Sequence, residues 1–409
     1  MLIALPLVLV TTLWVLAGLW ALVRSLRLAR APVASPLPGI TVLKPLCGRD
    51  PSLEENLATF FAQDYPAFEL VFGVQDPDDP ALEVVERLRA RHPEVTCRVL
   101  RQGSSGAKNP KVQNLMGMTA VASHDLCLIS DSNVSAPPTY LRELAAAIAD
   151  PAVGLVTNVF AGVGEESLGA ALENVQLNGF VASGTTLPNA MGNAAVVGKS
   201  MLFRRSVLER LGGLQSVAHV LAEDYVLGKM FQHAGYAVVV GPTVLRCHNG
   251  QQSLSRFFDR QKRWGMLRLR LSPLAHVLEP LASPFVMLPV AWIALGPWAL
   301  AWSLSLLLLR DLGGWWLLRG RDRLYLPLLL GGLRGLTMLA AWIAVPFVKY
   351  VPWRGTRMRV GTGTLVFAPD RPELKIVAIG ESYVVGREVV DGDHDRVVLV
   401  PIGDEHEFD

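Results

Sequence analysis

The sequence has few cysteines, little net charge, and no internal repeat or low-complexity tract. Its four cysteines, Cys47, Cys97, Cys127 and Cys247, lie far apart and form no Cys-x-x-Cys pair. This spacing argues against a zinc site or a disulfide framework and fits a reducing compartment, so we expect all four to be small core residues. The formal net charge of +2 at pH 7 gives no reason to expect nucleic acid as a partner.

The chain is nevertheless more apolar than most soluble proteins, since 51% of its 409 residues are hydrophobic. Residues 2–23 form an uncharged run of about the length that crosses a bilayer, followed by Arg24, Arg27 and Arg30. A cleaved signal peptide is the alternative, but the basic residues follow the apolar run, and the Pro-rich linker at 31–39 has no convincing cleavage site. The pattern predicts a transmembrane anchor at residues 1–30, with the next part of the chain in the cytosol.

Residues 31–275 alternate short apolar runs with amphipathic segments. Strands are predicted at 40–43, 69–74, 96–100, 126–130, 154–159 and 237–240. Helices are predicted at 51–61, 80–91, 138–148 and 223–234. This alternation predicts an α/β domain with a doubly wound, mostly parallel sheet.

Residues 276–350 are membrane-like again. The stretch 283–309 is long enough for one tilted span, or for two short ones with a tight hairpin at Gly296-Pro297. Residues 324–348 form another predicted span, and 310–323 an interfacial segment. Arg334 interrupts the second span; because such arginines usually face protein or water, it is a candidate functional residue. Residues 351–409 form a basic segment and an acidic tail, to which we assign no chemistry.

Three clusters of polar residues follow apolar runs or open a predicted helix in residues 31–275. They are Asp76, Asp78 and Asp79; Asp131, Ser132 and Asn133; and Glu223 and Asp224. Ligands of open α/β sheets bind at the carboxyl ends of parallel strands, which is where Asp131 is expected. Each cluster alone could be structural, because Asp131 suits a turn and acids suit a helix N-terminus.

Together the clusters fit a nucleotide-sugar transferase. Such an enzyme holds a nucleotide, neutralises a diphosphate, commonly through a divalent cation such as Mg²⁺ or Mn²⁺, and supplies a base for the acceptor hydroxyl. Two basic stretches could bind the diphosphate and stack on a ring: Lys108 with Lys111, and Arg260, Arg263 and Trp264. A basic amphipathic helix on anionic lipid is the alternative for the second stretch.

Six short motifs occur in order along the chain. They are Leu43-Lys-Pro-Leu46, Val74-Gln-Asp-Pro-Asp-Asp-Pro80, Asn109-Pro-Lys-Val-Gln-Asn-Leu115, Asp131-Ser-Asn133, Ala222-Glu-Asp-Tyr225 and Arg260-Gln-Lys-Arg-Trp264. This set closely resembles the ceramide glucosyltransferases of glycosyltransferase family 21, from the first membrane segment to about Val360, and includes Trp353-Arg354-Gly355. The resemblance implies a GT-A type nucleotide-diphospho-sugar transferase domain that faces the cytosol and is flanked by transmembrane helices.

The resemblance also implies roles for individual residues. Asp79, within the cluster that begins at Asp76, is expected to contribute to nucleotide binding, and Asp131 to binding of the nucleotide sugar and metal. Asp224 is the expected general base for the primary hydroxyl of ceramide. The motif residues Arg260, Arg263 and Trp264 are expected to line the sugar-nucleotide and acceptor sites, with Glu223 also at the acceptor site.

Two departures from the family pattern stand out. Asn133 occupies the place of the second acid of an Asp-x-Asp motif, so Asp131 is the predicted metal ligand, with Asn133 beside the nucleotide sugar. The histidine that animal enzymes carry after the Asn178-Gly179 region has no match in residues 182–188.

The predicted reaction is inverting transfer of a hexose, glucose from UDP-glucose, to ceramide. A related alternative is a hopanoid-type transferase that uses UDP-N-acetylglucosamine and a polyol-tailed triterpenoid, and a glucuronosyl donor is a third. A processive polysaccharide synthase would need more spans, and a catalytically silent scaffold would not need the three acidic clusters. The Ala-, Leu- and Arg-rich composition favours a bacterial inner membrane over a Golgi or reticulum membrane.

Overall fold

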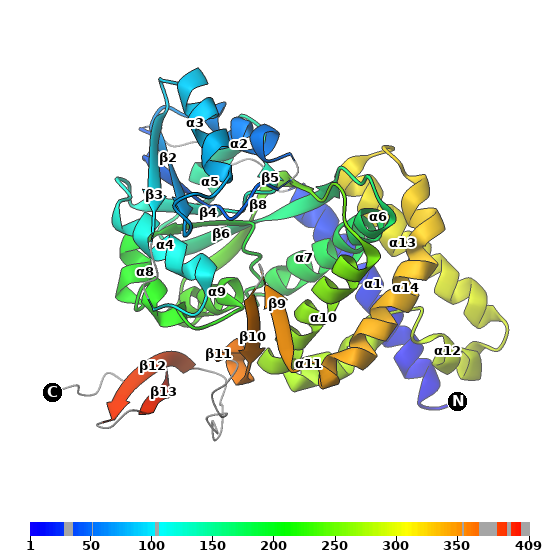
Figure 1. The fold of residues 1–409 in the computed structure, drawn as a ribbon. Coiled ribbons are helices and arrows are strands. Elements are labelled where there is room, and N and C mark those ends of the chain that lie inside the picture. Colours follow the sequence, from blue (N-terminus) through cyan, green and yellow to red (C-terminus); the bar gives the residue numbers. More distant parts are fainter. Residues whose placement is uncertain are drawn as a thin grey trace.

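The computed structural model describes residues 1–27, 36–50, 52–102, 106–353, 356–367, 383–390 and 394–401. Its centre is an eight-stranded sheet with the order β3-β2-β1-β4-β7-β6-β8-β5 (Figure 1). The strands are β1 (Ile40–Pro45), β2 (Phe68–Val74), β3 (Thr96–Arg101), β4 (Leu126–Ser130), β5 (Val134–Ser135), β6 (Val153–Val163), β7 (Ser200–Arg204) and β8 (Ala237–His248). Strands β1 to β4 pair in parallel, as do β6 and β8, whereas β7 and β5 run antiparallel to their neighbours. The predicted fold class is confirmed, and all six predicted strands are present.

Both faces of the sheet are buried, which explains why its strands are continuous apolar runs. In β1, Val42 contributes to one hydrophobic cluster and Leu43 to the other, because successive side chains of a strand point to opposite faces. Helices α2 (Leu53–Phe61), α3 (Ala81–Arg91) and α5 (Tyr140–Ala147) cover the first face (Figure 1). Helices α4 (Pro110–Ala120), α8 (Arg205–Arg210) and α9 (Glu223–His233) cover the second.

A helical bundle lies beside the sheet (Figure 1). Its members are α1 (Ala4–Leu26), α6 (Leu168–Gln176), η1 (Leu177–Val181), α7 (Ala182–Ala190), α10 (Leu254–Leu271), α11 (Pro273–Leu278), η3 (Glu279–Ala282), α12 (Leu288–Leu295), α13 (Trp298–Arg319), α14 (Tyr325–Ala344) and η4 (Val345–Phe347). Two segments in the described part of the chain are long and apolar enough to cross a membrane: Ala4–Leu26 and Tyr325–Phe347. They agree with the predicted apolar helices on either side of the α/β domain.

The predicted single span at 283–309 is wrong. Gly296 adopts a left-handed backbone (φ 56°) and ends α12, after which Pro297 precedes α13. The break predicted at Gly296-Pro297 in the two-span alternative is therefore confirmed, but α13 has 22 residues and is not one of the two short spans expected within 283–309. Helix α13 also continues through residues 310–319, which we expected to be interfacial, and it buries Arg310 and Asp311.

The remaining elements are short. They are η2 (Leu214–Val217), β9 (Tyr350–Trp353), β10 (Thr356–Val360), η5 (Thr362–Thr364), β11 (Val366–Phe367), β12 (Tyr383–Val390) and β13 (His394–Pro401). Arg30, Arg354-Gly355 and most of the acidic tail lie outside the described residues. The prediction of four core cysteines holds for Cys127 and Cys247 but is wrong for Cys47, which is exposed, and Cys97 is half-buried.

Candidate active site

The predicted acids of the second and third clusters meet around one lysine, Lys111. Asn109 caps α4 by accepting the backbone N–H groups of Lys111 and Val112, which places Lys111 in the first helical turn. Its Nζ lies 3.1 Å from Asp131 Oδ1 and 3.0 Å from Glu223 Oε1. The structure thus brings together Lys111, Asp131 and Glu223, which come from three separate segments.

Asp131 lies at the point where the strand order reverses. From β1 the chain adds β2 and β3 on one side and then β4 on the other, so the carboxyl ends of β1 and β4 flank a crevice of the kind that binds ligands. Lys44, at the end of β1, donates from Nζ to Ser130 Oγ at 2.9 Å and to the Asp131 carbonyl at 3.0 Å. Lys44 is fully buried, which is rare for a lysine. The sequence signal that was available for it is a lysine within an otherwise apolar predicted strand.

Lys199 completes the cationic lining and was missed by the sequence analysis. Its Nζ lies 3.5 Å from Asp131 Oδ2 and donates to Asn133 Oδ1 at 2.9 Å. Lys199 reaches this place because β7 pairs antiparallel with β4, with Ser200 opposite Ser130, so that the start of β7 meets the end of β4. No local sequence pattern predicts that pairing.

The surrounding lysines determine the charge of Asp131. Burial raises the pKa of this carboxyl, but Lys111 and Lys199 outweigh burial and bring the pKa down to about 2. Asp131 is therefore ionised at physiological pH. Lys111 and Lys199 contact this carboxylate at 3.1 and 3.5 Å, and ammonium groups of this kind also bind the oxygens of a diphosphate.

Asp224 has the opposite electrostatic environment. Its Oδ2 accepts the Gly198 N–H at 2.7 Å, next to Lys199 in the chain. Burial and the adjacent Glu223 carboxylate raise the pKa of Asp224 to about 6, against the opposing effect of Lys111. A carboxylate whose pKa lies near neutrality is suited to act as a general base.

The first acidic cluster organises a loop. Asp79 is buried, and its carboxylate accepts the N–H groups of Gly48, at 2.8 Å, and Ala81, at 2.8 Å. Asp76 is exposed and accepts the Asp78 N–H at 2.9 Å. The loop held by Asp79 continues to Asp50, which accepts a hydrogen bond from Ser132 Oγ at 2.8 Å. The three clusters therefore lie along one edge of the sheet.

Arg260 approaches the same edge from α10. Its Nη1 lies 3.2 Å from Glu173 Oε1 and 3.5 Å from Asn249 Oδ1. Asn249 follows His248, whose N–H donates to the Asn133 carbonyl at 2.9 Å. Sequence analysis missed Glu173, His248 and Asn249, because nothing in their local pattern distinguishes them from structural polar residues.

The other predicted residues are less central. Trp264 is half-buried and packs against the hydrophobic cluster of the first sheet face, and Arg263 is half-buried beside it in α10. Lys108 is exposed, and its backbone N–H donates to His219 Nδ1 at 3.3 Å. Their assignments to the nucleotide-sugar and acceptor sites stay predictions.

Comparison with known proteins identifies the family. The family model described as glycosyl transferase family 21 matches residues 3–366. The chain belongs to this family. It is 31% identical over 246 residues to ceramide glucosyltransferase 1 of Caenorhabditis elegans, and the aligned region covers 60% of this chain and 53% of that protein. It is 38% identical over 107 residues to the ceramide glucosyltransferase of Komagataella phaffii, and the aligned region covers 25% of this chain and 21% of that protein.

The chain spans about half the length of the first of these curated relatives. Among solved structures, it resembles mannosyltransferase PcManGT from Pyrobaculum calidifontis in complex with GDP-Man and Mn²⁺, with a TM-score of 0.50 and 21% identity. The match covers 84% of this chain and 98% of that one. It supports the GT-A fold of this family 21 member.

In this family 21 member, a divalent cation bound with a diphosphate would meet oxygens that lysines now contact: Asp131 lies beside Lys111 and Lys199, and Asn133 Oδ1 accepts a hydrogen bond from Lys199. Asp131 and Asn133 can supply two oxygens, and Mg²⁺ usually binds one or two carboxylates while phosphates and water complete its shell. The described residues contain no group of three His, Cys, Asp or Glu side chains that could hold a metal ion alone.

Proposed function

We propose that this protein transfers glucose from UDP-glucose to the primary hydroxyl of ceramide, with inversion at the anomeric carbon. The observation that carries the proposal is the pairing of a base, Asp224, with the lysine-lined crevice around Asp131 on the same sheet edge. The relatives named ceramide glucosyltransferase support the choice of ceramide as the acceptor and glucose as the transferred sugar.

In this reaction Asp224 accepts the proton of the acceptor hydroxyl. The hydroxyl oxygen forms a bond to the anomeric carbon as the bond from that carbon to the diphosphate oxygen breaks, and UDP leaves with the bonding electrons. One base and direct displacement suffice for an inverting transfer. Lys111 and Lys199 stabilise the charge that develops on the leaving diphosphate.

A divalent cation, Mg²⁺ or Mn²⁺, belongs to this proposal. Asp131 and Asn133 would hold it against the diphosphate, where it would neutralise negative charge on the leaving group. Lys111 also contacts Glu223 and the Gly198 carbonyl, so its position does not depend on Asp131 alone.

We further propose that the protein is an integral membrane protein whose catalytic domain faces the cytosol. Its two apolar segments, Ala4–Leu26 and Tyr325–Phe347, support membrane attachment, and Arg24 and Arg27 at the end of α1 favour a cytosolic position for that end. A bacterial inner membrane is the proposed location, or a Golgi or reticulum membrane in a eukaryote.

The test uses purified full-length protein in detergent with short-chain ceramide and a panel of UDP-sugars, with and without Mg²⁺ or Mn²⁺. Mass spectrometry of the lipids should detect hexosyl-ceramide with UDP-glucose. Asp224→Asn should abolish the product, whereas Asp64→Asn, the same change at an exposed carboxylate paired with Arg142, should not. Transfer only to a hopanoid polyol, or only from UDP-N-acetylglucosamine, would contradict the proposal.

A further inference from the structure

The segment that leads to the base, residues 218–222, is held on both of its edges by segments that are distant in the chain. We call it the base loop, because Glu223 and Asp224 follow it directly. Glu223 contacts Lys111 at 3.0 Å, and Asp224 accepts the Gly198 N–H at 2.7 Å. Contacts that fix the base loop therefore also fix the base relative to Lys111.

Asn109 holds the first edge of the base loop. Its Nδ2 donates to the Val220 carbonyl at 2.7 Å and to Glu223 Oε2 at 3.3 Å. Its backbone N–H donates to the Ala218 carbonyl at 3.0 Å. The side chain is fully buried. Because a carbonyl and an ionised carboxylate only accept hydrogen bonds, the end of the amide that faces the loop must be the nitrogen.

The same amide group connects the two halves of the site. Its Oδ1 accepts N–H groups in the first turn of α4, which carries Lys111, while its Nδ2 holds the loop before Asp224. Capping a helix requires only the oxygen, and serine or aspartate serves about as well at this position. The contacts of the nitrogen are therefore the part of Asn109 that capping does not explain.

Thr364 holds the opposite edge. Its carbonyl accepts the Leu221 N–H at 2.9 Å, and its Oγ1 accepts the Ala222 N–H at 3.3 Å. The Val366 N–H donates to the His219 carbonyl at 2.8 Å. Thr364 is fully buried and has a left-handed backbone, with φ 61°. This conformation is unfavourable for a β-branched residue, so the surrounding contacts must hold it in place.

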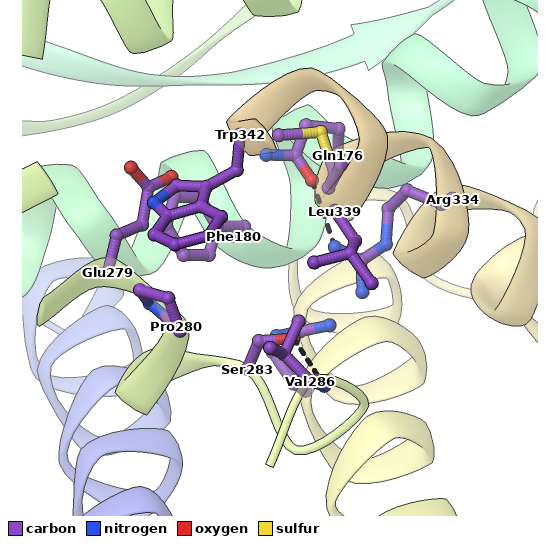
Figure 2. A pocket seen from close by; sticks show the side chains of 11 residues that line it. Gln176, Phe180, Glu279, Pro280, Ser283, Val286, Arg334, Leu339 and Trp342 are labelled. Atoms are coloured by element: carbon purple, nitrogen blue, oxygen red, sulfur yellow. Dashed lines mark hydrogen bonds between the residues drawn. The ribbon is translucent and has the colours of Figure 1, made fainter. Parts of the chain in front are cut away.

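The segment that contains Thr364 reaches the base loop from the helical bundle. Helix α14 is anchored in the bundle by Arg334, whose Nη1 donates to Gln176 Oε1 at 3.0 Å (Figure 2). After α14, Val345 of η4 and Val366 of β11 belong to one hydrophobic cluster with Leu221 of the base loop. The bundle therefore supports the base loop through packed side chains as well as through hydrogen bonds.

We propose that Asn109 and Thr364 are positioning residues that hold the base loop from its two edges and so orient Asp224 toward the acceptor hydroxyl. Both side chains are fully buried, so each acts through the loop and not directly on a substrate. The inference rests on the proposed function, because it concerns the base of that reaction. Asn109 should have the larger effect, since its contact at 2.7 Å is shorter than the 3.3 Å contact of Thr364 Oγ1.

The first test is Asn109→Ser, which keeps an oxygen for the cap and removes the donor to Val220. We expect kcat for transfer from UDP-glucose to fall roughly 10- to 100-fold, because a displaced base is poorly aligned with the hydroxyl. The Kd for UDP, measured by titration calorimetry, should stay within about twofold of the wild type, because the cap that places Lys111 is kept. Asn193→Ser, the same change at an exposed position, should alter neither value.

The second test concerns the hydroxyl group of Thr364. Thr364→Val keeps the shape of the side chain and removes Oγ1, so kcat should fall several-fold. Thr364→Ser keeps the hydroxyl group and should retain kcat within about twofold. Thr362→Val, at an exposed position of the same turn, is the control and should behave like the wild type. A Thr364→Ser variant as slow as Thr364→Val would exclude this hydroxyl group from positioning the base.

Three outcomes for Asn109→Ser would overturn the inference. They are an unchanged kcat, a loss of kcat with an equal loss of UDP affinity, and failure to fold, which would assign the amide to stability alone. A wild type that forms no glucosyl-ceramide would instead refute the proposed function, before any variant is compared.

Discussion

The Nζ atom of Lys199 lies 2.9 Å from Oδ1 of Asn133, the residue that replaces the second acid of an Asp-x-Asp motif. The same ammonium group lies 3.5 Å from Asp131 Oδ2. The ammonium group of Lys199 therefore contacts both positions at which an Asp-x-Asp motif would place its carboxylates. This arrangement makes Lys199 a residue that the donor diphosphate should meet.

Removal of Lys199 should weaken donor use. Lys199→Met takes away a charged hydrogen-bond donor, which is worth about 1.5–3 kcal/mol, so kcat/KM for UDP-glucose should fall roughly 10- to 140-fold. Lys229→Met, on the more exposed side of α9, is the matched control and should stay within about twofold. Equal kcat/KM values for the two variants would remove Lys199 from the donor site.

The rate should depend on pH through Asp224. Because burial and Glu223 raise the pKa of Asp224 to about 6, the base is lost as the pH falls below that value. We expect kcat/KM to decrease about tenfold per pH unit below pH 6 and to level off above it. Asp131, whose pKa is about 2, does not titrate in this range. A flat profile of kcat/KM between pH 5 and pH 7 in protein that remains folded would contradict the assignment of the base.

Cation dependence should respond to position 133. Chelation should lower the transfer rate, and Mg²⁺ or Mn²⁺ should restore it. Asn133→Asp adds a second carboxylate beside Asp131, and hard cations prefer charged oxygen ligands, so the Mg²⁺ concentration for half-maximal activity should fall several-fold. Titration calorimetry with Mg²⁺ and UDP gives a readout independent of turnover. The same half-maximal concentration in both proteins would exclude position 133 from the cation site.

The packing of α13 on η1 within the helical bundle should depend on Gly314. A Cβ atom at this position would lie 2.3 Å from the Asn178 carbonyl oxygen, so Gly314→Ala forces α13 away from η1. Strain of this kind typically costs about 1–3 kcal/mol, and the melting temperature in detergent should fall. Gly332→Ala in α14 meets no atom within 4 Å and should melt at or slightly above the wild-type temperature. Equal losses in both variants would contradict this account of the interface.

The sequence by itself determined the strands that carry the site. Residues 126–129 are apolar without alternation, because a strand covered on both faces buries every side chain, and the polar residues that follow such a run, here Ser130 and Asp131, are expected at the carboxyl end of the strand. Asp131 was found for this reason. The apolar segments near both ends were equally visible, since their length and composition are local properties.

Only the tertiary structure decided which polar groups meet. Lys199 joins Asp131 because β7 reverses direction beside β4, and Arg334 joins Asp311 and Gln176 because α14 packs on α13 and α6. These contacts depend on the order of strands and the packing of helices that are distant in the chain. Periodicity reports which face of an element is buried, but not which element covers it, so sequence alone could identify Arg334 as a candidate and could not name its partners.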